Sequence, residues 1–343
     1  MRYTSEYLMP AEWEKHEATW LSWPVNKETW PGEKISATEI VFAKMIYYLS
    51  HSEKVRINLL TDQKEQDRIM SLLTRENVLM DEVTFYPNKS NDAWCRDHGP
   101  IFVRDRQGKK VITNWEYNAW GGKYLPFDDD NRIPASIAGM LSYPIVSPGI
   151  ILEGGSLDVN GKGTLLTTRS CLLNKNRNPH LTRKQIEEYL HRYLGATNIL
   201  WLGEGVVGDD TDGHVDDISR FINRSTIVTM IETNKDDDNY LPLKENADYL
   251  KKMTDQDGQL FEIIELPMPS PLITDGLRLP ASYSNFYISN KYVLVPVFND
   301  KNDDKVLSIL QSLFKDREVI GIDCRDLIWG QGAIHCVTQQ EIA

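Results

Sequence analysis

The chain has 343 residues, of which 41% are hydrophobic and 26% are charged, so it is long enough to bury a full core. Its formal net charge of −12 argues against a nucleic-acid partner, because proteins that bind phosphate backbones carry clusters of Lys and Arg. The acidic charge would attract a cationic substrate, although acidity also serves solubility alone. No apolar run reaches the roughly 18 residues that a membrane span needs.

The N-terminal segment, residues 1–14, contains no apolar core of a secretory signal, so the cytoplasm is the expected compartment. The four cysteines form no C-x-x-C pair and fit neither a disulfide framework nor a structural zinc site. They are Cys95, Cys171, Cys324 and Cys336. In a reducing compartment they should be thiols, and one of them could act as a nucleophile.

Helical and strand patterns alternate along the chain. Apolar residues at helical spacing first predict an amphipathic helix over residues 36–49. Hairpins of two short apolar strands are then expected over residues 99–112 and 156–166. Thr182 and Gln185 form a capping box, which predicts that another helix begins there. The second half continues with hairpins over 218–228 and 286–295 and helices over 242–253 and 303–314.

A polar residue opens each of the four predicted hairpins. These residues are Asp97, Glu153, Asp216 and Asn285, and their successive separations are 56, 63 and 69 residues. Such regularity favours repeated units arranged as in a propeller-like ring. An ordinary mixed α/β sheet with several hairpins stays open as the alternative.

In a ring of such units the strand starts face a common axis, so side chains far apart in the sequence would converge there. The candidates are Trp94, Asp97, Glu153, His214, Asp216 and Cys336. A calcium loop around Gly213 is excluded, because Gly208 and Ser219 stand where Asp and Glu are needed. Zinc binding by His214 and Asp216 would rest on a weak two-residue pattern, so no metal or other cofactor is expected.

Cys336 is the best nucleophile candidate among the thiols. It follows a loop that contains Gly330 and Gly332, which lets backbone and substrate approach closely. Cys171 and Cys324 are more typical of buried, inert thiols. Cys336 could also be a packed core thiol, and only a nearby histidine would favour the catalytic role.

Six motifs follow one another from end to end of the chain. They are MPAEWE at 9–14, WCRDHGP at 94–100, EGG at 153–155, NKNRNPH at 174–180, DGHVD at 212–216 and IHCVTQQ at 334–340. Together they resemble the agmatine deiminase family of the guanidine-modifying superfamily. The resemblance implies one α/β domain over residues 1–343, a five-bladed pseudo-symmetric propeller built from ββαβ units, which is metal-free and forms a homo-oligomer.

The resemblance also implies a role for five of the candidates. Asp97 and Asp216 would hold a planar guanidinium through charge-assisted hydrogen bonds. Cys336 would attack the central carbon, and His214 would protonate the departing ammonia and then take a proton from water. Glu153 would orient His214 and favour its charged form.

Four further residues are expected around the substrate. Trp94 would pack on the guanidinium or its alkyl chain, although an ordinary core role stays open for this aromatic side chain. Gly332 lies in a loop expected at the pocket mouth, where Gln331 interrupts the run of glycines usual in the family. The amine of agmatine would suit Asp92, Asp210 or a bridging water.

The expected function is hydrolysis of agmatine to N-carbamoylputrescine and ammonia. A deiminase for peptidyl arginine or another guanidine is the alternative within the same class. From other classes, a polyamine-binding protein without turnover and a metal-dependent amidohydrolase stay open. A binding protein should release no ammonia, and a metal enzyme should lose activity to chelators and tolerate the change Cys336→Ala.

Overall fold

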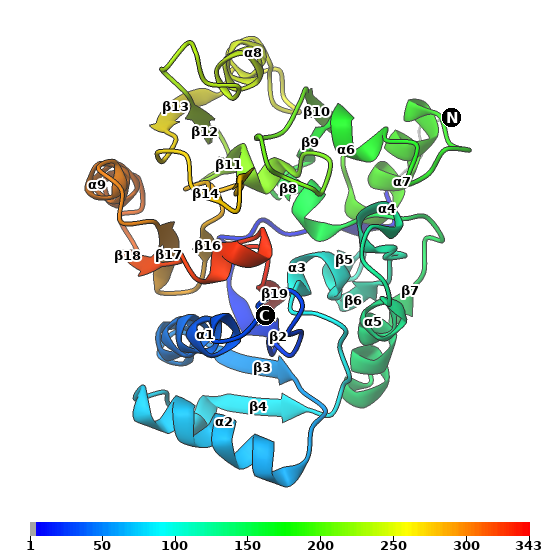
Figure 1. Cartoon of the computed structure of the whole chain (residues 1–343). Helices are drawn as coiled ribbons and strands as arrows, with labels where there is room; N and C mark the ends of the chain where they lie inside the picture. Colours follow the sequence, from blue (N-terminus) through cyan, green and yellow to red (C-terminus); the bar gives the residue numbers. More distant parts are fainter. Residues whose placement is uncertain (1–4) are drawn as a thin grey trace.

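The computed structural model describes residues 5–343, so the first four residues of the N-terminal segment discussed above lie outside it. Within that range the strands form five sheets of three or four strands and one separate two-stranded hairpin. Figure 1 shows the five larger sheets distributed around a central region, with the long helices on the outside. The architecture is mixed α/β.

Four of the sheets share one topology. Each begins with an antiparallel hairpin, continues through a helix, and ends with a strand parallel to the second hairpin strand. The first unit consists of β5 (Ile101–Asp105), β6 (Lys110–Thr113), α5 (Asp128–Leu141) and β7 (Ile145–Val146). The second consists of β8 (Asp158–Val159), β9 (Thr164–Thr168), α7 (Arg183–Leu194) and β10 (Asn198–Leu202). The third unit consists of β11 (Ser219–Phe221), β12 (Thr226–Ile231), α8 (Tyr240–Leu250) and β13 (Glu262–Pro267). The fourth consists of β16 (Tyr287–Ile288), β17 (Tyr292–Val297), α9 (Asp303–Leu313) and β18 (Glu318–Asp323).

The fifth sheet joins the two ends of the chain. Its C-terminal strand pairs antiparallel with an N-terminal strand, and two more strands continue in parallel. The strands are β19 (Gln339–Ile342), β2 (His16–Ser22), β3 (Lys54–Asn58) and β4 (Val83–Tyr86), and the connecting helices are α1 (Lys34–Ser50) and α2 (Gln63–Arg75). Because β19 begins three residues after Cys336, its pairing with β2 fixes the position of this thiol.

Shorter elements complete the described chain. They are β1 (Tyr7–Leu8), which pairs with β5; β14 (Ile273–Thr274) and β15 (Leu277–Arg278); the single-turn helices α3 (Cys95–His98), α4 (Ala119–Gly122) and α6 (Arg169–Leu172); and the 3-10 turns η1 (Met80–Glu82), η2 (Gly154–Ser156), η3 (Val215–Asp217) and η4 (Leu327–Gly330).

The four predicted hairpins are confirmed, because each contains an antiparallel strand pair. The capping box is also confirmed, since the Thr182 hydroxyl accepts the Gln185 N–H and the Gln185 side chain accepts the Thr182 N–H. Helix α8 starts two residues before the predicted position, because Pro242 is tolerated in a first helical turn. Helices α2 and α5 have no counterpart among the predicted ones. Across residues 5–343, no helix combines the length and apolarity that crossing a membrane requires.

The long helices bury one apolar face against the sheets. In α1, Phe42, Met45 and Leu49 are fully buried. Each such side chain contributes roughly 1.5–3 kcal/mol relative to an exposed position. This packing holds the sheets, and with them the turns that lead into each unit, in fixed positions.

Candidate active site

The turns that enter the hairpins carry the candidate residues. The turn α3 contains Asp97 and leads into β5, η2 follows Glu153 and leads into β8, and η3 contains Asp216 and leads into β11. His214 is the residue immediately before η3. The turn α3 packs on η2, and η2 packs on η3. The repeated unit thus brings together polar residues that are far apart in the sequence.

Gly155 marks the point at which three of these side chains meet. A methyl group at its Cα would lie 2.5 Å from His214 Nδ1, 2.8 Å from Asp97 Oδ1 and 3.0 Å from Asp216 Oδ2. His214 Nδ1 lies 3.7 Å from Asp97 Oδ1. No side chain other than hydrogen fits at position 155 without displacing them, which explains the second glycine of the Glu153-Gly154-Gly155 motif.

The two carboxylates differ in their partners. Asp97 accepts hydrogen bonds from the Gly155 N–H and from Trp120 Nε1, each at 2.9 Å, and burial raises its pKa. Asp216 Oδ2 lies 2.6 Å from His335 Nδ1, while its buried Oδ1 has no hydrogen-bond partner among the described residues. Burial, followed by the charge of Asp97, raises the pKa of Asp216 well above its ordinary range. A cationic donor between these carboxylates would satisfy Oδ1 and offset both charges.

Cys336 is 7% exposed and lies beside one of these carboxylates. Its Sγ is 4.0 Å from Asp216 Oδ2 and accepts a hydrogen bond from Asn285 Nδ2 at 3.0 Å. Burial and then the charges of Asp216 and Asp217 raise the pKa of the thiol well above its ordinary value. Without a cation at the site, Cys336 is therefore protonated at neutral pH.

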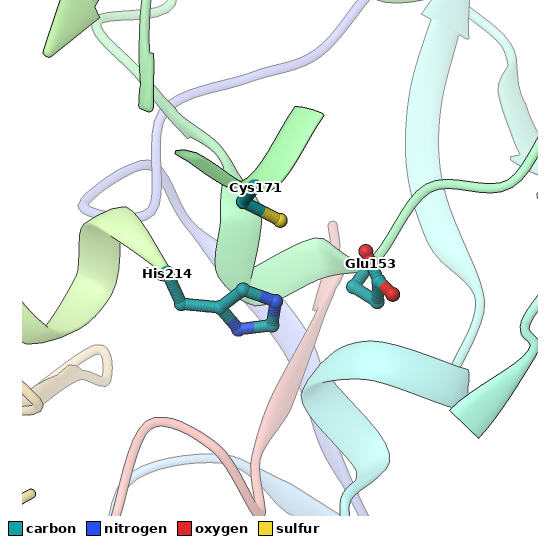
Figure 2. A group of neighbouring side chains, drawn as sticks. All are labelled: Glu153, Cys171 and His214. Atoms are coloured by element: carbon teal, nitrogen blue, oxygen red, sulfur yellow. The ribbon is translucent and has the colours of Figure 1, made fainter. Parts of the chain in front are cut away.

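His214 and Glu153 are neighbours that do not bond to each other. Figure 2 shows the Glu153 carboxylate and the Cys171 thiol on the same side of the His214 ring. His214 Nε2 and Glu153 Oε2 are both buried without a hydrogen-bond partner in the described chain, and Glu153 Oε1 accepts from Arg177 Nε at 2.6 Å. Burial lowers the pKa of His214, against the opposing charges of Glu153 and Asp209.

Trp94 and Gly332 are packed against each other beside Cys336. A methyl group on Gly332 would overlap the Trp94 ring and would lie 3.1 Å from Cys336 Cβ. The Trp94 ring also contacts Trp30 and Trp120, with ring centroids 5.4 Å and 6.4 Å away. Trp94 thus forms part of an aromatic wall next to the thiol.

The two residues suggested for the amine already have hydrogen-bond donors. Asp92 accepts from the Thr29 hydroxyl and from Asn26 Nδ2, and burial raises its pKa to about 6. Asp210 accepts from the Tyr124 hydroxyl, and burial raises its pKa. Both connect to the site through neighbours rather than by direct contact with Cys336: Asp92 precedes Trp94 by two residues, and the Tyr124 ring packs on Trp120.

Sequence reasoning missed several residues of the site. Asn285 appeared only as a hairpin opener, yet its amide oxygen accepts the N–H groups of His335 and Cys336. His335 Nε2 lies 2.8 Å from Glu12 Oε2, so His335 links Asp216 to Glu12. The adjacent His335-Cys336 pair could have signalled this role.

Trp120 had no sequence signal at all. It sits in a turn with φ of 54°, a left-handed conformation that non-glycine residues rarely adopt, and donates to Asp97. Its position depends on tertiary contacts that no local pattern encodes.

Two groups of buried side chains in the described chain have donor atoms close enough for a metal ion. One is Glu153, Cys171 and His214, and the other is Asp216, Asp217 and Cys336; within each group the ligand atoms lie within 4.8 Å of one another. His214 and Asp216, the pair weighed for zinc, fall in different groups. The expectation that catalysis is metal-free stays a prediction.

Comparison with known proteins gives one consistent result. The profile of the Porphyromonas-type peptidyl-arginine deiminases matches residues 8–341. The agmatine deiminase of Medicago truncatula is 37% identical over 98% of this chain and 96% of its own length. The solved agmatine deiminase of C. jejuni with substrate bound has a TM-score of 0.89 at 31% identity, over 98% of this chain and 96% of that one. The solved agmatine deiminase of Enterococcus faecalis has a TM-score of 0.89 at 30% identity, over 99% of this chain and 98% of that one. The chain is therefore a member of the Porphyromonas-type peptidyl-arginine deiminase family and a relative of the agmatine deiminases.

Proposed function

We propose that this protein hydrolyses agmatine to N-carbamoylputrescine and ammonia through a covalent bond to Cys336. The observation that carries the proposal is the meeting of Asp97, Asp216 and His214 around Gly155, with the Cys336 thiol 4.0 Å from Asp216. Two carboxylates, an imidazole and a thiol around one buried point suit a planar cation that is attacked at its central carbon.

Substrate binding would activate the nucleophile. Burial and neighbouring carboxylates raise the pKa of Cys336, so the thiol of the free protein is protonated. A guanidinium held by Asp97 and Asp216 places a positive charge beside the sulfur and lowers that pKa. Asn285 Nδ2, 3.0 Å from Sγ, would further stabilise the thiolate. Cys336 is thereby reactive mainly when the cation is present.

The chemistry divides into two steps. The Cys336 thiol first passes its proton to His214, and the resulting thiolate forms a bond to the guanidinium carbon. His214 then gives this proton to one terminal nitrogen, and the C–N bond breaks to release ammonia and leave an S-alkyl thiouronium. Water then attacks the same carbon and gives a proton to His214. The C–S bond breaks, which regenerates the Cys336 thiolate and leaves a urea group on the substrate. The balance is agmatine plus water to N-carbamoylputrescine plus ammonia.

The charges around the site favour agmatine over free arginine. Three arginines of the described chain lie next to the site, and each pairs with a carboxylate: Arg177 with Glu153 at 2.6 Å, Arg220 with Glu12 at 3.0 Å and Arg96 with Glu12 at 3.3 Å. None of the three is free to pair with the α-carboxylate of arginine. A substrate without that carboxylate avoids placing a further anion in this acidic surrounding.

The test is a comparison of kcat/KM for agmatine, free arginine and an arginine-containing peptide, followed by ammonia release. The proposal expects the highest value for agmatine. A higher value for the peptide would favour the peptidyl-arginine alternative, which the family profile supports. Binding of agmatine without any ammonia would favour the polyamine-binding alternative.

The arrangement and setting of the protein are part of the same proposal. We propose that the five larger sheets are the blades of one five-bladed propeller domain of ββαβ units over residues 1–343. The unit topology that four of them share and the β19–β2 pairing support this. A cytoplasmic homo-oligomer is proposed from the sequence and from family resemblance. Sedimentation velocity on the purified protein tests the oligomeric state.

A further inference from the structure

A buried cluster lies behind the catalytic histidine. Glu153, Cys171 and His214 are each at most 1% exposed, and one donor atom from each lies within 4.8 Å of the others. Figure 2 shows the thiol and the carboxylate facing the same edge of the imidazole ring. Because His214 Nδ1 is directed to Asp97, Nε2 is the ring nitrogen available to this cluster.

Two atoms of the cluster are left without a hydrogen bond. His214 Nε2 and Glu153 Oε2 have no partner within residues 5–343, although both are buried. Buried polar atoms in folded proteins are nearly always paired, with protein or with another bound group. One donor atom of each residue lies within 4.8 Å of the others, so a ligand that accepts electron pairs from both residues would satisfy these two atoms.

The donor set and the charges specify the ligand. Thiolate sulfur, imidazole nitrogen and carboxylate oxygen are the ligands of Zn²⁺ and other thiophilic divalent cations. The Cys171 thiolate would offset one charge of a dication, and Glu153, which also pairs with Arg177, would be shared between the two cations. The neighbouring Arg177 takes up only Glu153 Oε1 and also pairs with Asp212 at 2.6 Å, a carboxylate that it shares with Lys123.

The elements that carry the three side chains are tied together. Cys171 lies in α6, whose N-cap residue Thr168 donates to the carbonyl of Gly213, the residue before His214. Zinc ligands in a tetrahedral site lie about 3.5 Å apart, so donor atoms that lie within 4.8 Å of one another must approach by at most about 1.3 Å.

We infer that Glu153, Cys171 and His214 form an inhibitory binding site for a thiophilic divalent cation such as Zn²⁺. Binding forms an S–metal bond and releases the Cys171 thiol proton to solvent. The bound ion holds His214 Nε2 and Glu153, so the imidazole no longer exchanges protons with substrate and water. The inhibitory effect rests on the proposed deimination, whereas cation binding does not.

Cobalt absorbance tests the binding site without any enzymatic assay. The full chain, purified without metal, is titrated with Co²⁺ while the sulfur-to-cobalt charge-transfer band is recorded. We expect the band in the wild type, in Cys324→Ser and in Cys336→Ser, and its loss in Cys171→Ser. Cys324 is a matched control because it is another fully buried thiol. A wild type without the band, or a band that survives in Cys171→Ser, would overturn the inference, as would its loss in Cys336→Ser.

Zinc inhibition then tests the consequence. Cys171→Ser should keep the activity of the wild type and require a Zn²⁺ concentration higher by about 10- to 100-fold for half inhibition, since even groups that only orient a metal ligand contribute this much. Equal inhibition of both proteins contradicts the inference.

If Cys171→Ser does not fold, anomalous diffraction from wild-type crystals soaked in Zn²⁺ tests the site directly. A peak among Sγ of Cys171, Nε2 of His214 and Oε2 of Glu153 supports the site, and no peak there overturns it. A protein that binds cobalt through Cys171 but releases no ammonia would refute the proposed function alone.

Discussion

Replacing Gly155 by Ala should disable the site while leaving the fold intact. The added methyl would lie 2.5 Å from His214 Nδ1, whereas ordinary contact begins at 3.4 Å, so the imidazole must move by about 0.9 Å. Asp97 and Asp216 must also yield, because the methyl approaches their oxygens to 2.8 Å and 3.0 Å. A misplacement of about 1 Å costs on the order of 100-fold in rate, or about 2.7 kcal/mol of activation free energy.

The assay is kcat for ammonia release from agmatine, with the thermal midpoint measured in parallel to detect unfolding. Gly139→Ala is the matched control, since Gly139 lies in α5 and an added methyl would have no atom within 4 Å beyond its chain neighbours and the backbone of its own helix. It should retain the wild-type kcat. A folded Gly155→Ala enzyme with the wild-type kcat would refute the claim that Asp97, Asp216 and His214 meet at this point.

Three further changes probe the surroundings. Trp120→Phe removes the N–H that Asp97 accepts; a hydrogen bond to a charged group contributes about 1.5–3 kcal/mol, so kcat/KM for agmatine should fall by about 10- to 100-fold. Asn285→Asp replaces a donor to Cys336 by a negative charge, so the pKa of the thiol should rise and the acidic limb of the kcat/KM profile should move to higher pH; a limb that stays or moves to lower pH contradicts this. Burial raises the pKa of Asp130 to about 7 in the folded protein, against about 3.9 in the unfolded chain. The folded state therefore binds this proton more tightly, and the resulting stabilisation is full below about pH 4 and is lost as the pH rises through 7. The stability of Asp130→Asn relative to the wild type, read from urea midpoints, should therefore be greater at pH 8 than at pH 4, by at most about 4 kcal/mol. An equal stability difference at both pH values contradicts the raised pKa of Asp130.

Local patterns predicted the repeated hairpins because their signals lie within a few residues. Asn160 and Gly161, for example, form a turn between two apolar runs, and the strands on either side pair as expected. Helix α5 escaped prediction because Pro134 lies inside it, and proline normally ends a helical pattern. Its stability comes from buried Ile133 and Ile137, which tertiary packing rather than propensity supplies.

The site was less accessible to sequence reasoning than the fold. The predicted residues Asp97, Asp216, His214 and Cys336 do lie together, but their roles stay proposals. The Asn285 contact to Cys336 spans 51 residues, so only the closed arrangement of the units reveals it. Motifs identify candidate catalytic residues, whereas the side chains that position those residues by hydrogen bonds come from distant parts of the chain.

The most direct test of the central claim is ammonia release from agmatine in excess chelator, measured for the wild type and for Cys336→Ala. A cysteine-dependent, metal-free deimination predicts steady release by the wild type and none by the variant. Release that persists in Cys336→Ala, or that stops in the wild type when the chelator is added, would contradict it.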